Sequence, residues 1–283
     1  MRLSIVTINY NNAEGLRKTL ASVVSQTYKS IEHIIIDGAS TDDSVNVIES
    51  YVRDVSCMKC DVLWVSEKDK GIYNAMNKGI RKASGDYVQI LNSGDILAEG
   101  DVVERMVMEL ERNEYPSILY GNMLKSYDMK TIINRDTCGS GMYTPDSFMY
   151  FYKGTMNHDC AYIRRDLFEK YGLYNEQMKI CSDWEWYVRA IVLGGEKPVY
   201  TNIDVTIFDM NGVSESRGRN AELIKKERRE YLEKILPATI LHDYDIFSFP
   251  ILQYQRLKKY HLWGLVYFME RVLFKLEKWH ILK

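Results

Sequence analysis

The chain has 283 residues, 46% of them hydrophobic, which is enough for one large domain or for one domain with an extension. Its formal net charge of -2 gives no support to nucleic-acid binding as the main role. No uninterrupted apolar run is long enough to cross a bilayer, and Met1 leads almost directly into an apolar strand, so we expect no transmembrane helix and no signal peptide.

The first strand and helix show clear patterns. Residues 3–8 (LSIVTI) predict a strand, and Asn12 is expected to cap the helix that follows. The inner face of this helix carries Leu16, Leu20 and Val23.

A second strand and helix follow in the same order. Residues 33–36 predict a strand that Asp37 and Gly38 close, and Thr41 is expected to cap the next helix. The inward residues of that helix are Val45, Ile48 and Val52. Residues 62–65 predict a third strand.

Cysteine usage indicates the compartment. The five cysteines are odd in number and irregularly spaced, which indicates a reducing compartment and hence a cytoplasmic protein. Cys57 and Cys60, just before the third strand, form a lone CxxC motif, so we expect ordinary thiols and no zinc site.

The stretch from 67 to 95 (EKDKGIYNAMNKGIRKASGDYVQILNSGD) contains a charged loop, a helix, a turn, a strand and a short acidic loop. Apolar residues recur at helical spacing at Ile72, Met76, Ile80 and Ala83. Gly85 and Asp86 make a turn, and residues 87–91 form the short apolar run of a strand covered on both faces. The strand ends in a loop that contains Asp95.

Strands that alternate with helices imply right-handed crossovers and a parallel sheet. A polar loop rich in acids, amides and hydroxyls follows each predicted strand: residues 7–11, 37–42, 67–71 and 92–95. Ligands of such sheets bind just beyond the carboxyl ends of the strands, so we expect the site there.

Phosphate-binding signatures of other nucleotide-binding proteins are missing. The sequence has no GxGxxG after its first strand and no GxxxxGK[ST], which disfavours a dinucleotide dehydrogenase and a P-loop NTPase. Acidic loops repel phosphates unless a divalent cation bridges the two, so a phosphate ligand here calls for Mg²⁺ or Mn²⁺.

Six motifs occur in a fixed order: SIVTINYNN, IIIDGASTDDS, the stretch 67–95, NHDCAYIRRDLF, SDWEWYVR and FDMNGVS. Together they make the chain resemble family 2 glycosyltransferases of the GT-A fold, of the bacterial type that builds polysaccharides and cell-surface glycans. The resemblance covers about residues 1 to 215.

The resemblance implies an α/β fold with two halves. A Rossmann-like, mostly parallel nucleotide-sugar half spans about residues 1–100, and an acceptor-side half with added strands and helices spans about 101–216. Residues 217–283 are expected to form a C-terminal helical extension.

The resemblance also implies an inverting transferase, assisted by Mg²⁺ or Mn²⁺. It would move a sugar from a nucleotide-sugar, expected to be UDP-linked, to a hydroxyl of a glycan or lipid-linked acceptor in cell-surface polysaccharide synthesis.

Specific positions match the family's functional residues. On the donor side they are Thr7 and Tyr10 for the base, Asp37 for uracil or ribose, Asp69 for base and ribose, Asn92 in the loop after the fourth strand, and Asp95 for the metal. On the acceptor side they are Asp183 as catalytic base and His158 near the diphosphate or acceptor. Glu185 and Arg189, on the same predicted helix as Asp183, are further candidates for contact with the acceptor or diphosphate, although Arg189 could also pair with a carboxylate or face solvent.

The sequence departs from the family pattern at two places. The usual acidic pair after the second strand is Asp37-Gly38 here, and the usual run of acids after the fourth strand leaves only Asp95. A single carboxylate can still complete an octahedral site together with diphosphate and water.

Four of the donor-side assignments have a structural alternative. Asp37 and Asp95 also fit turn residues at strand ends, since Asp favours such positions. Asp69 lies between two lysines and fits a solvated loop charge equally well, and Tyr10 fits a half-buried aromatic.

Local physics also explains the segment around Asp183. Ser182 and Glu185 form an S-x-x-E capping box, which would place Asp183 in the first turn of a helix. The helix dipole would keep its carboxylate ionised, as a base requires. Glu185 is the second candidate for the base.

Two further features of the acceptor side stay open. His158 fits a structural histidine as well as a ligand contact. The loop 208–216, with Gly212 and followed by Arg217 and Arg219, fits either a lid over the diphosphate or a basic surface loop.

The last section, residues 217–283, mixes aromatic and basic residues and suits a membrane interface, where lipid-linked acceptors lie. A helical pair on the catalytic core or on a second subunit, as in a homo-oligomer, fits about as well.

Two other function classes stay open. A sugar nucleotidyltransferase would normally show a glycine-rich basic loop after the first strand, which SIVTINYNN is not. A non-catalytic nucleotide-sugar binder is favoured by the reduced acidic motif and disfavoured by Asp183.

Overall fold

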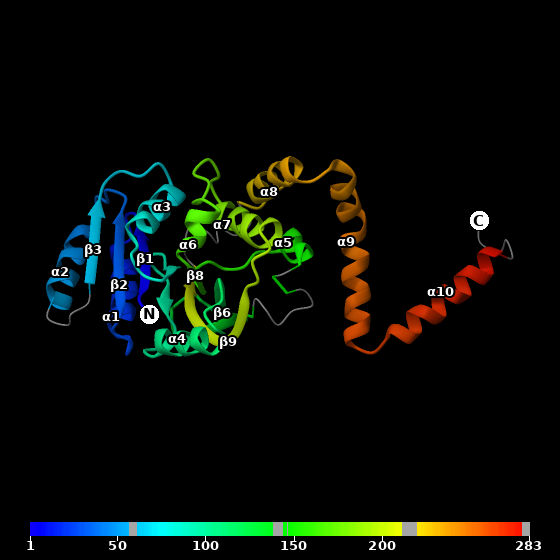
Figure 1. Cartoon of the computed structure of the whole chain (residues 1–283), viewed down its shortest axis with the longest axis horizontal. Helices are drawn as coiled ribbons and strands as arrows, with labels where there is room; N and C mark the ends of the chain where they lie inside the picture. The colour runs from blue at the N-terminus through cyan, green and yellow to red at the C-terminus, as the bar shows by residue number, and fades with distance from the viewer. Residues whose placement is uncertain (57–60, 138–143, 146, 211–219, 279–283) are drawn as a thin grey trace. The chain divides into compact units, whose positions relative to one another are not determined.

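The computed structural model describes residues 1–56, 61–137, 144–145, 147–210 and 220–278. In these residues nine strands form one sheet, in the order β3-β2-β1-β4-β8-β6-β9-β5, and β7 pairs with β6 (Figure 1). The strands are β1 (Leu3–Asn9), β2 (Ile31–Asp37), β3 (Asp61–Ser66), β4 (Tyr87–Ile90), β5 (Ile96–Leu97), β6 (Ile118–Ser126), β7 (Ile132–Asp136), β8 (Ala161–Arg164) and β9 (Val199–Asp209).

The helices lie between these strands and after them. They are α1 (Ala13–Val24), α2 (Ser44–Ser56), α3 (Ile72–Lys82), α4 (Val102–Arg112), α5 (Phe148–Lys153), α6 (Asp166–Lys170), α7 (Ser182–Tyr187), the π-helical continuation η1 (Val188–Leu193), α8 (Ala221–Ile235), α9 (Ala238–Lys259) and α10 (Trp263–Lys278).

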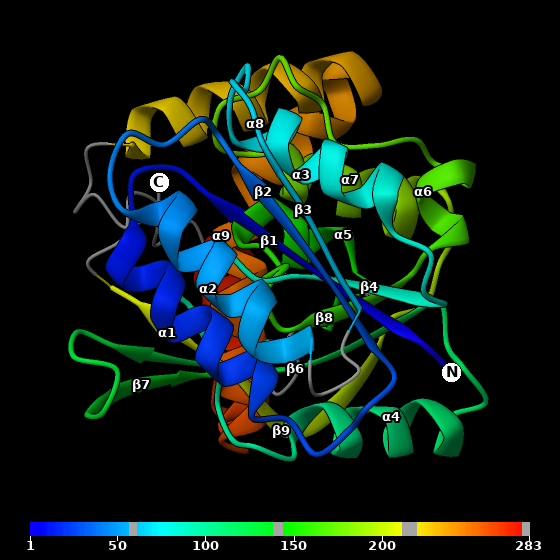
Figure 2. The same cartoon turned by 90° about the vertical axis from the view of Figure 1, so that its left-hand side faces the viewer.

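The first four strands form the predicted parallel half. β1 pairs in parallel with β2 and β4, and β2 pairs in parallel with β3. The helices α1 and α2 pack together on one face of these strands (Figure 2), where Leu16, Ile35 and Ile48 share one buried cluster. A Cβ atom on Gly79 would lie 2.2 Å from Val6 Cγ1, so α3 approaches β1 closely enough to need a glycine there. Residues 87–90 are buried throughout, as the apolar run predicted.

Asn12 caps α1, as predicted. Its Oδ1 accepts a hydrogen bond from the backbone N–H of Gly15 at 3.2 Å. The predicted cap at Thr41 is wrong, because α2 begins at Ser44 and the Thr41 N–H donates to Asn11 Oδ1 at 2.7 Å. At the start of α2 the backbone N–H of Ser44 instead donates to Asp42 Oδ1 at 3.0 Å. Of the predicted inward residues of α2, Ile48 lies in the buried cluster and Val52 packs against it, whereas Val45 does neither. The cluster also contains Val47, Tyr51 and Val55, which were not predicted.

Antiparallel pairings extend the sheet beyond β4. β8 pairs antiparallel with both β4 and β6, whereas β6 and β9 run parallel to each other. The helix α4 buries Val103, Met106 and Leu110 in the core cluster beneath these strands. This addition brings the end of β9 beside the end of β4, where the acidic loop lies.

Residues 1–228 form one compact unit and residues 229–283 form a second. The helix α8 runs across the boundary, and α9 and α10 are the predicted C-terminal helices. Among the helices that the structure describes, none is both long and apolar enough to span a membrane.

Candidate functional site

The carboxylate of Asp37 joins the ends of three parallel strands. It accepts hydrogen bonds from Asn9 Nδ2 (2.8 Å) in β1 and from Ser66 Oγ (2.6 Å) in β3. Ser40 donates both its N–H (2.9 Å) and its hydroxyl (2.5 Å) to it. Burial alone would raise the pKa of Asp37, but these bonds lower it, so the group is a buried anion that fixes the strand ends.

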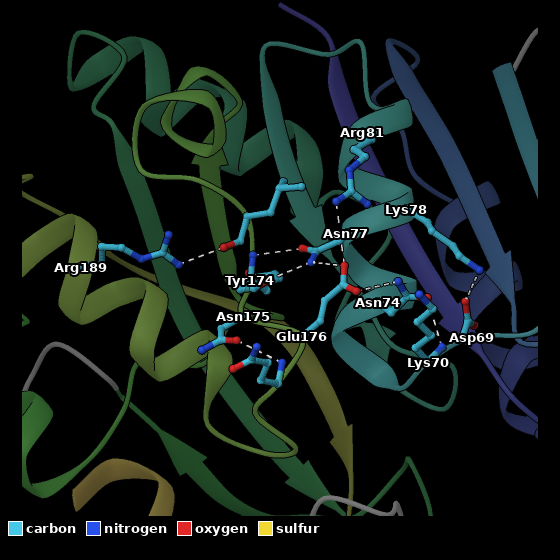
Figure 3. Close-up of polar contacts among 12 residues, drawn as sticks. Asp69, Lys70, Asn74, Asn77, Lys78, Arg81, Tyr174, Asn175, Glu176 and Arg189 are labelled. Atoms are coloured by element: carbon cyan, nitrogen blue, oxygen red, sulfur yellow. Dashed lines mark hydrogen bonds and ion pairs between the residues drawn. The ribbon is translucent and has the colours of Figure 1, made fainter. Parts of the chain in front are cut away.

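Tyr10, Gly38 and Asp69 meet beside this point. A Cβ atom at Gly38 would lie 3.1 Å from both Asp69 Oδ2 and Tyr10 Cδ2. The glycine therefore leaves room for these two side chains to lie close to the backbone at position 38. The Tyr10 side chain is 68% exposed. Asp69 Oδ1 accepts from Lys78 Nζ of α3 at 2.6 Å (Figure 3), so Asp69 is held in place and is not a freely solvated loop charge.

The Thr7 side chain lies apart from Tyr10, Gly38 and Asp69. Its side chain is fully buried, and its hydroxyl lies 3.0 Å from Nε2 of the buried His33. The structure therefore does not bring the Thr7 side chain together with the groups that face a ligand. Its role in base binding stays a prediction.

Asp95 lies buried at the edge between the two halves of the sheet. Its Oδ1 accepts from the backbone N–H of Asp209 at 3.0 Å, and its backbone oxygen accepts from Thr19 Oγ1 at 2.7 Å. Burial raises the pKa of Asp95 well above its usual range, and the neighbouring charge of Asp159 raises it further. Burial raises the pKa of Asp159 as well, although Thr206 Oγ1 donates to its carboxylate at 3.2 Å.

Asp183 sits in the first turn of α7, where two side chains hold its carboxylate. His158 Nδ1 lies 3.0 Å from Oδ2, and the Tyr73 hydroxyl lies 3.2 Å from Oδ1. Burial would raise the pKa of Asp183, but the hydrogen bond and the positive charge of His158 lower it below its usual value. The carboxylate is therefore ionised, as a general base must be.

His158 links Asp183 to the loop after β4, because its Nε2 lies 3.2 Å from Asn92 Nδ2. In this orientation the Asn92 NH₂ group donates to Nε2. That requires a neutral ring with no proton on Nε2 and its one N–H proton on Nδ1. Burial lowers the pKa of His158, but the hydrogen bond to Asp183 and the surrounding carboxylates raise it to about 9, so the ring is charged at neutral pH. A charged ring is satisfied when the Asn92 amide turns over and Oδ1, which otherwise has no hydrogen-bond partner, accepts from Nε2.

The loop before α7 is fixed to α3 by side-chain amides (Figure 3). Asn77 donates to the Tyr174 oxygen (2.9 Å) and accepts from the Tyr174 N–H (3.0 Å). Glu176 accepts from Asn74 (2.8 Å) and from Asn77 (2.9 Å). The helix that follows the Asp69 loop therefore also supports the segment that leads to Asp183.

Glu185 and Arg189 form a separate contact on the same helical segment. Arg189 Nη2 lies 2.9 Å from Glu185 Oε2 and also donates to the Leu173 oxygen at 2.9 Å, while Nη1 donates to the Tyr171 oxygen. The structure does not bring this pair together with the Asp183 carboxylate. The capping box is also wrong, since Glu185 pairs with Arg189 and the Ser182 hydroxyl has no hydrogen-bond partner.

The oxygen ligands at Asp95 suit Mg²⁺ or Mn²⁺, which prefer carboxylates, diphosphate oxygens and water. A buried carboxylate whose pKa is raised by neighbouring carboxylates is stabilised when a cation offsets their repulsion. Within the described residues, no three His, Cys, Asp or Glu side chains converge on one metal position. The Asp95 carboxylate therefore fits one ligand position of such a cation, and the remaining ligands would have to come from the donor and from water.

Three residues of this site were not singled out by their sequence. Asp159 and Asp209 lie inside the quoted motifs NHDCAYI and FDMNGVS, and only the pairing of β8 and β9 with their neighbours brings them beside Asp95. Tyr73 resembled an ordinary helix residue.

Residues 211–219, which include most of the candidate lid loop with Gly212, Arg217 and Arg219, lie outside the described residues, as do Cys57 and Cys60.

A cavity of about 450 Å³ lies at the opposite end of the strands, where β1 and β4 begin, lined by Met1, Tyr87, Tyr115 and Arg164 among others. None of the predicted site residues lines it. The strand ends that carry the ionised groups are the better candidate site, because ligands of α/β sheets bind there.

Comparisons with known proteins indicate what the chain is similar to. The family model described as Glycosyl transferase family 2 matches residues 4–172. An "uncharacterized glycosyltransferase" of Mycobacterium tuberculosis (strain CDC 1551 / Oshkosh) is 33% identical over 222 residues, which are 77% of this chain and 79% of that protein. A "PGL/p-HBAD biosynthesis glycosyltransferase" of Mycobacterium bovis (strain BCG / Pasteur 1173P2) is 26% identical over 187 residues, 66% of this chain and 68% of that protein.

Solved structures share the fold. The structure of S. aureus TarS 1-349 in complex with UDP-GlcNAc matches with a TM-score of 0.65 and 14% identity, over 91% of this chain and 73% of that one. The mannosyltransferase PcManGT from Pyrobaculum calidifontis, in complex with GDP-Man and Mn²⁺, matches with a TM-score of 0.62 and 18% identity, over 93% and 72% of the two chains. The predicted GT-A architecture is thereby confirmed.

Proposed function

Because this chain belongs to glycosyl transferase family 2, we propose that it moves a sugar from a UDP-sugar to a hydroxyl of a glycan or lipid-linked acceptor, with inversion at the anomeric carbon. The observation that carries the proposal is the ionised Asp183 carboxylate, held by His158 and Tyr73 beside the loop that ends in Asp95.

Asp183 acts as the base in this proposal. Its carboxylate takes the proton of the acceptor hydroxyl while that oxygen attacks the anomeric carbon. The bond from the anomeric carbon to the diphosphate oxygen breaks on the opposite face, and UDP leaves with the electron pair. His158 keeps Asp183 ionised and oriented, which supports the low pKa that the base needs.

The donor would bind across the strand ends, with residues 1–100 supplying most of its contacts. The exposed ring of Tyr10 suits stacking on a base, and the fixed carboxylate of Asp69 suits hydrogen bonds to base or ribose. Asp37 holds the loop between them and already accepts four hydrogen bonds, which favours a supporting role over direct contact.

Asp95 would be the protein ligand of a divalent cation that arrives with the donor. A bound Mg²⁺ or Mn²⁺ would supply charge compensation for the leaving diphosphate. Asp159 and Asp209 add negative charge around Asp95, which supports cation binding there. Asn92 connects this loop to His158, so donor binding and base orientation share one residue.

Incubation with a panel of UDP- and GDP-sugars and Mn²⁺ tests the proposal through nucleotide release and transfer to added acceptors. Release of UDP from one UDP-sugar, increased by an acceptor, is expected. Binding of a nucleotide-sugar without turnover would favour a non-catalytic binder, and formation of a nucleotide-sugar from a sugar phosphate would favour a nucleotidyltransferase.

The C-terminal helices would bring the enzyme to a membrane surface that carries its acceptor. Large apolar side chains are exposed along α10, among them Tyr267 (55%), Phe268 (64%) and Phe274 (68%). Arg271 and Lys275 on the same helix are also exposed, and this mixture suits an interface with anionic lipid.

Flotation with anionic vesicles tests the membrane proposal. The wild-type chain is expected to float and the double variant Phe268→Ser, Phe274→Ser to stay at the bottom, whereas neutral vesicles should capture less of either. Equal flotation of both forms would reject the membrane role. Concentration-dependent self-association that only the wild type shows would assign the surface to a second copy.

A further inference from the structure

Glu227 of α8 holds the backbone just before the helix that carries Asp183. Its Oε1 accepts from the N–H of Lys179 at 2.7 Å, and its Oε2 accepts from the N–H groups of Ile180 (3.1 Å) and Cys181 (3.0 Å). The side chain comes from 46 positions further along the chain than Cys181 and is 9% exposed. One buried carboxylate thus accepts three consecutive backbone donors.

These donors immediately precede α7, and Cys181 is its N-cap residue, whose backbone N–H has no partner within the helix. A carboxylate suits this place, because charge-assisted bonds to N–H groups are stronger than neutral ones and the helix dipole favours a negative charge. The next residue of α8 contributes too, since the Arg228 guanidinium lies 5.1 Å from the Trp184 ring centre. Helix α8 therefore fixes both the approach to α7 and its first turn.

The same backbone segment is connected to the base. The Tyr73 hydroxyl contacts both the Ile180 oxygen and Asp183 Oδ1, while the Ile180 N–H donates to Glu227. A shift of the peptide at Ile180 would therefore move Tyr73 and Asp183 relative to each other. The distance between Asp183 and His158 depends on the same segment, because Asp183 is only two residues beyond Cys181.

We propose that Glu227 is a positioning residue that sets the Asp183 carboxylate against His158, and thereby controls the rate of glycosyl transfer and not donor binding. The inference rests on the proposed function for the catalytic effect, and Glu227 lies beyond the residues that the family model matches. A competing explanation is that Glu227 only anchors α8 to the rest of the unit, and an experiment can separate the two.

The variant Glu227→Gln tests the proposal. It keeps the size of the side chain but replaces one accepting oxygen by an NH₂ group, which faces a backbone N–H and cannot accept from it. Glu222→Gln is the matched control, since Glu222 lies on the same helix, has a side chain that is 87% exposed and pairs with Lys225. Glu227→Asp keeps the charge and should restore part of the lost function.

We expect Glu227→Gln to lower kcat by about 10- to 100-fold, because small displacements of a catalytic group have effects of that size. The donor KM should change by less than about twofold, since an interaction that acts only on the chemical step leaves ground-state binding intact. The pH titration of the His158 ring, followed by NMR in the intact chain, should move to lower pH as its contact with Asp183 loosens.

The outcomes are distinguishable. A His158 titration in Glu227→Gln that matches the wild type, with only the thermal midpoint lowered, would overturn the proposal and leave Glu227 as an anchor of α8. If Glu227→Gln does not fold, the same titration and the kcat-to-KM comparison in Glu227→Asp decide. A wild-type chain that transfers no sugar would refute the proposed function, whereas the His158 titration would still report on Glu227.

Discussion

The Nδ1 atom of His158 lies 3.0 Å from Oδ2 of Asp183, so one buried pair joins the segment before β8 to the first turn of α7. The histidine raises the fraction of Asp183 that is ionised, and Asp183 in turn stabilises the charged ring. The pair therefore links the protonation state of the site to its geometry, and substitutions at either residue should affect both.

Asp183→Asn should abolish transfer while donor binding remains. The amide cannot accept the acceptor proton, and loss of a positioned base typically costs about 100- to 10,000-fold in rate. The nucleotide-sugar should still bind within about twofold of the wild-type Kd, since uniform binding does not depend on the base. Initial rates and calorimetric titration of the donor measure the two quantities, and full activity of Asp183→Asn would place the base elsewhere.

Glu185→Gln should lower stability and leave transfer largely intact. Glu185 is the second carboxylate near the start of α7, but it pairs with Arg189, whose guanidinium also holds the Tyr171 and Leu173 carbonyls. Loss of a partly buried charge-assisted bond should cost about 1 to 3 kcal/mol in the free energy of unfolding. Urea denaturation and initial rates, compared with those of Asp183→Asn, decide which of the two carboxylates is the base.

His158→Asn should change how stability depends on pH. The asparagine keeps an N–H donor near the position of Nδ1 but loses the charge. In the folded wild type the pKa of His158 is raised to about 9, above the ordinary value of 6.5. Its contribution to stability is therefore fully present below pH 6.5 and is lost as the pH rises through about 9.

The wild type should thus exceed His158→Asn by roughly 3 kcal/mol at pH 6, and the difference should shrink toward zero by about pH 10. Urea unfolding across this range measures it, with the exposed His242 replaced by Asn as a control for the loss of a histidine. A difference that stays constant with pH would mean that His158 is neutral in the folded state.

The parallel half could be predicted from sequence because its signals are local. Apolar runs such as residues 3–8 and the helical spacing in α3 each specify an element within a few residues, and the order of elements then determines the sheet. Asp95 was singled out because it follows a predicted strand, whereas the role of Asp183 was implied by the family resemblance, and both roles stay predictions.

The rest of the site depends on pairings between distant segments, which local patterns do not encode. Asp209 reaches Asp95 only because β9 pairs antiparallel with the two-residue strand β5. The capping box predicted at Ser182 and Glu185 is an error of another kind. The local sequence pattern is present, but the capping hydrogen bonds do not form because other groups bind the same atoms. Glu185 binds Arg189, and the backbone donors before α7 bind Glu227 from far along the chain.

Tyr10→Ala should weaken donor binding without affecting stability. The ring is 68% exposed, so its removal leaves the core intact. Stacking of a base on an aromatic ring contributes about 1 to 2 kcal/mol, so the Kd for UDP should rise roughly 5- to 30-fold. Tyr10→Phe should bind normally, and Tyr260→Ala, which removes a ring of 67% exposure elsewhere, serves as control. Unchanged UDP affinity in Tyr10→Ala would place the base away from this loop.

Asp95→Asn should have opposite effects on the free protein and on its complex. The asparagine Oδ1 can still accept from the Asp209 N–H, so the local hydrogen bond remains. The substitution removes a buried negative charge beside Asp159, and burial together with that neighbour raises the pKa of Asp95, which means that ionisation there costs free energy. The thermal midpoint of the free variant should therefore equal or exceed that of the wild type at neutral pH.

The complex should respond differently, because the same carboxylate would hold the divalent cation that would compensate the charge of the diphosphate. UDP with Mn²⁺ should raise the thermal midpoint of the wild type, and EDTA should remove that rise. In Asp95→Asn the rise should be absent with Mn²⁺ present, whereas Asp166→Asn, which changes a carboxylate of 60% side-chain exposure, should behave like the wild type. A UDP-induced rise in Asp95→Asn that still depends on Mn²⁺ would mean that other residues hold the cation.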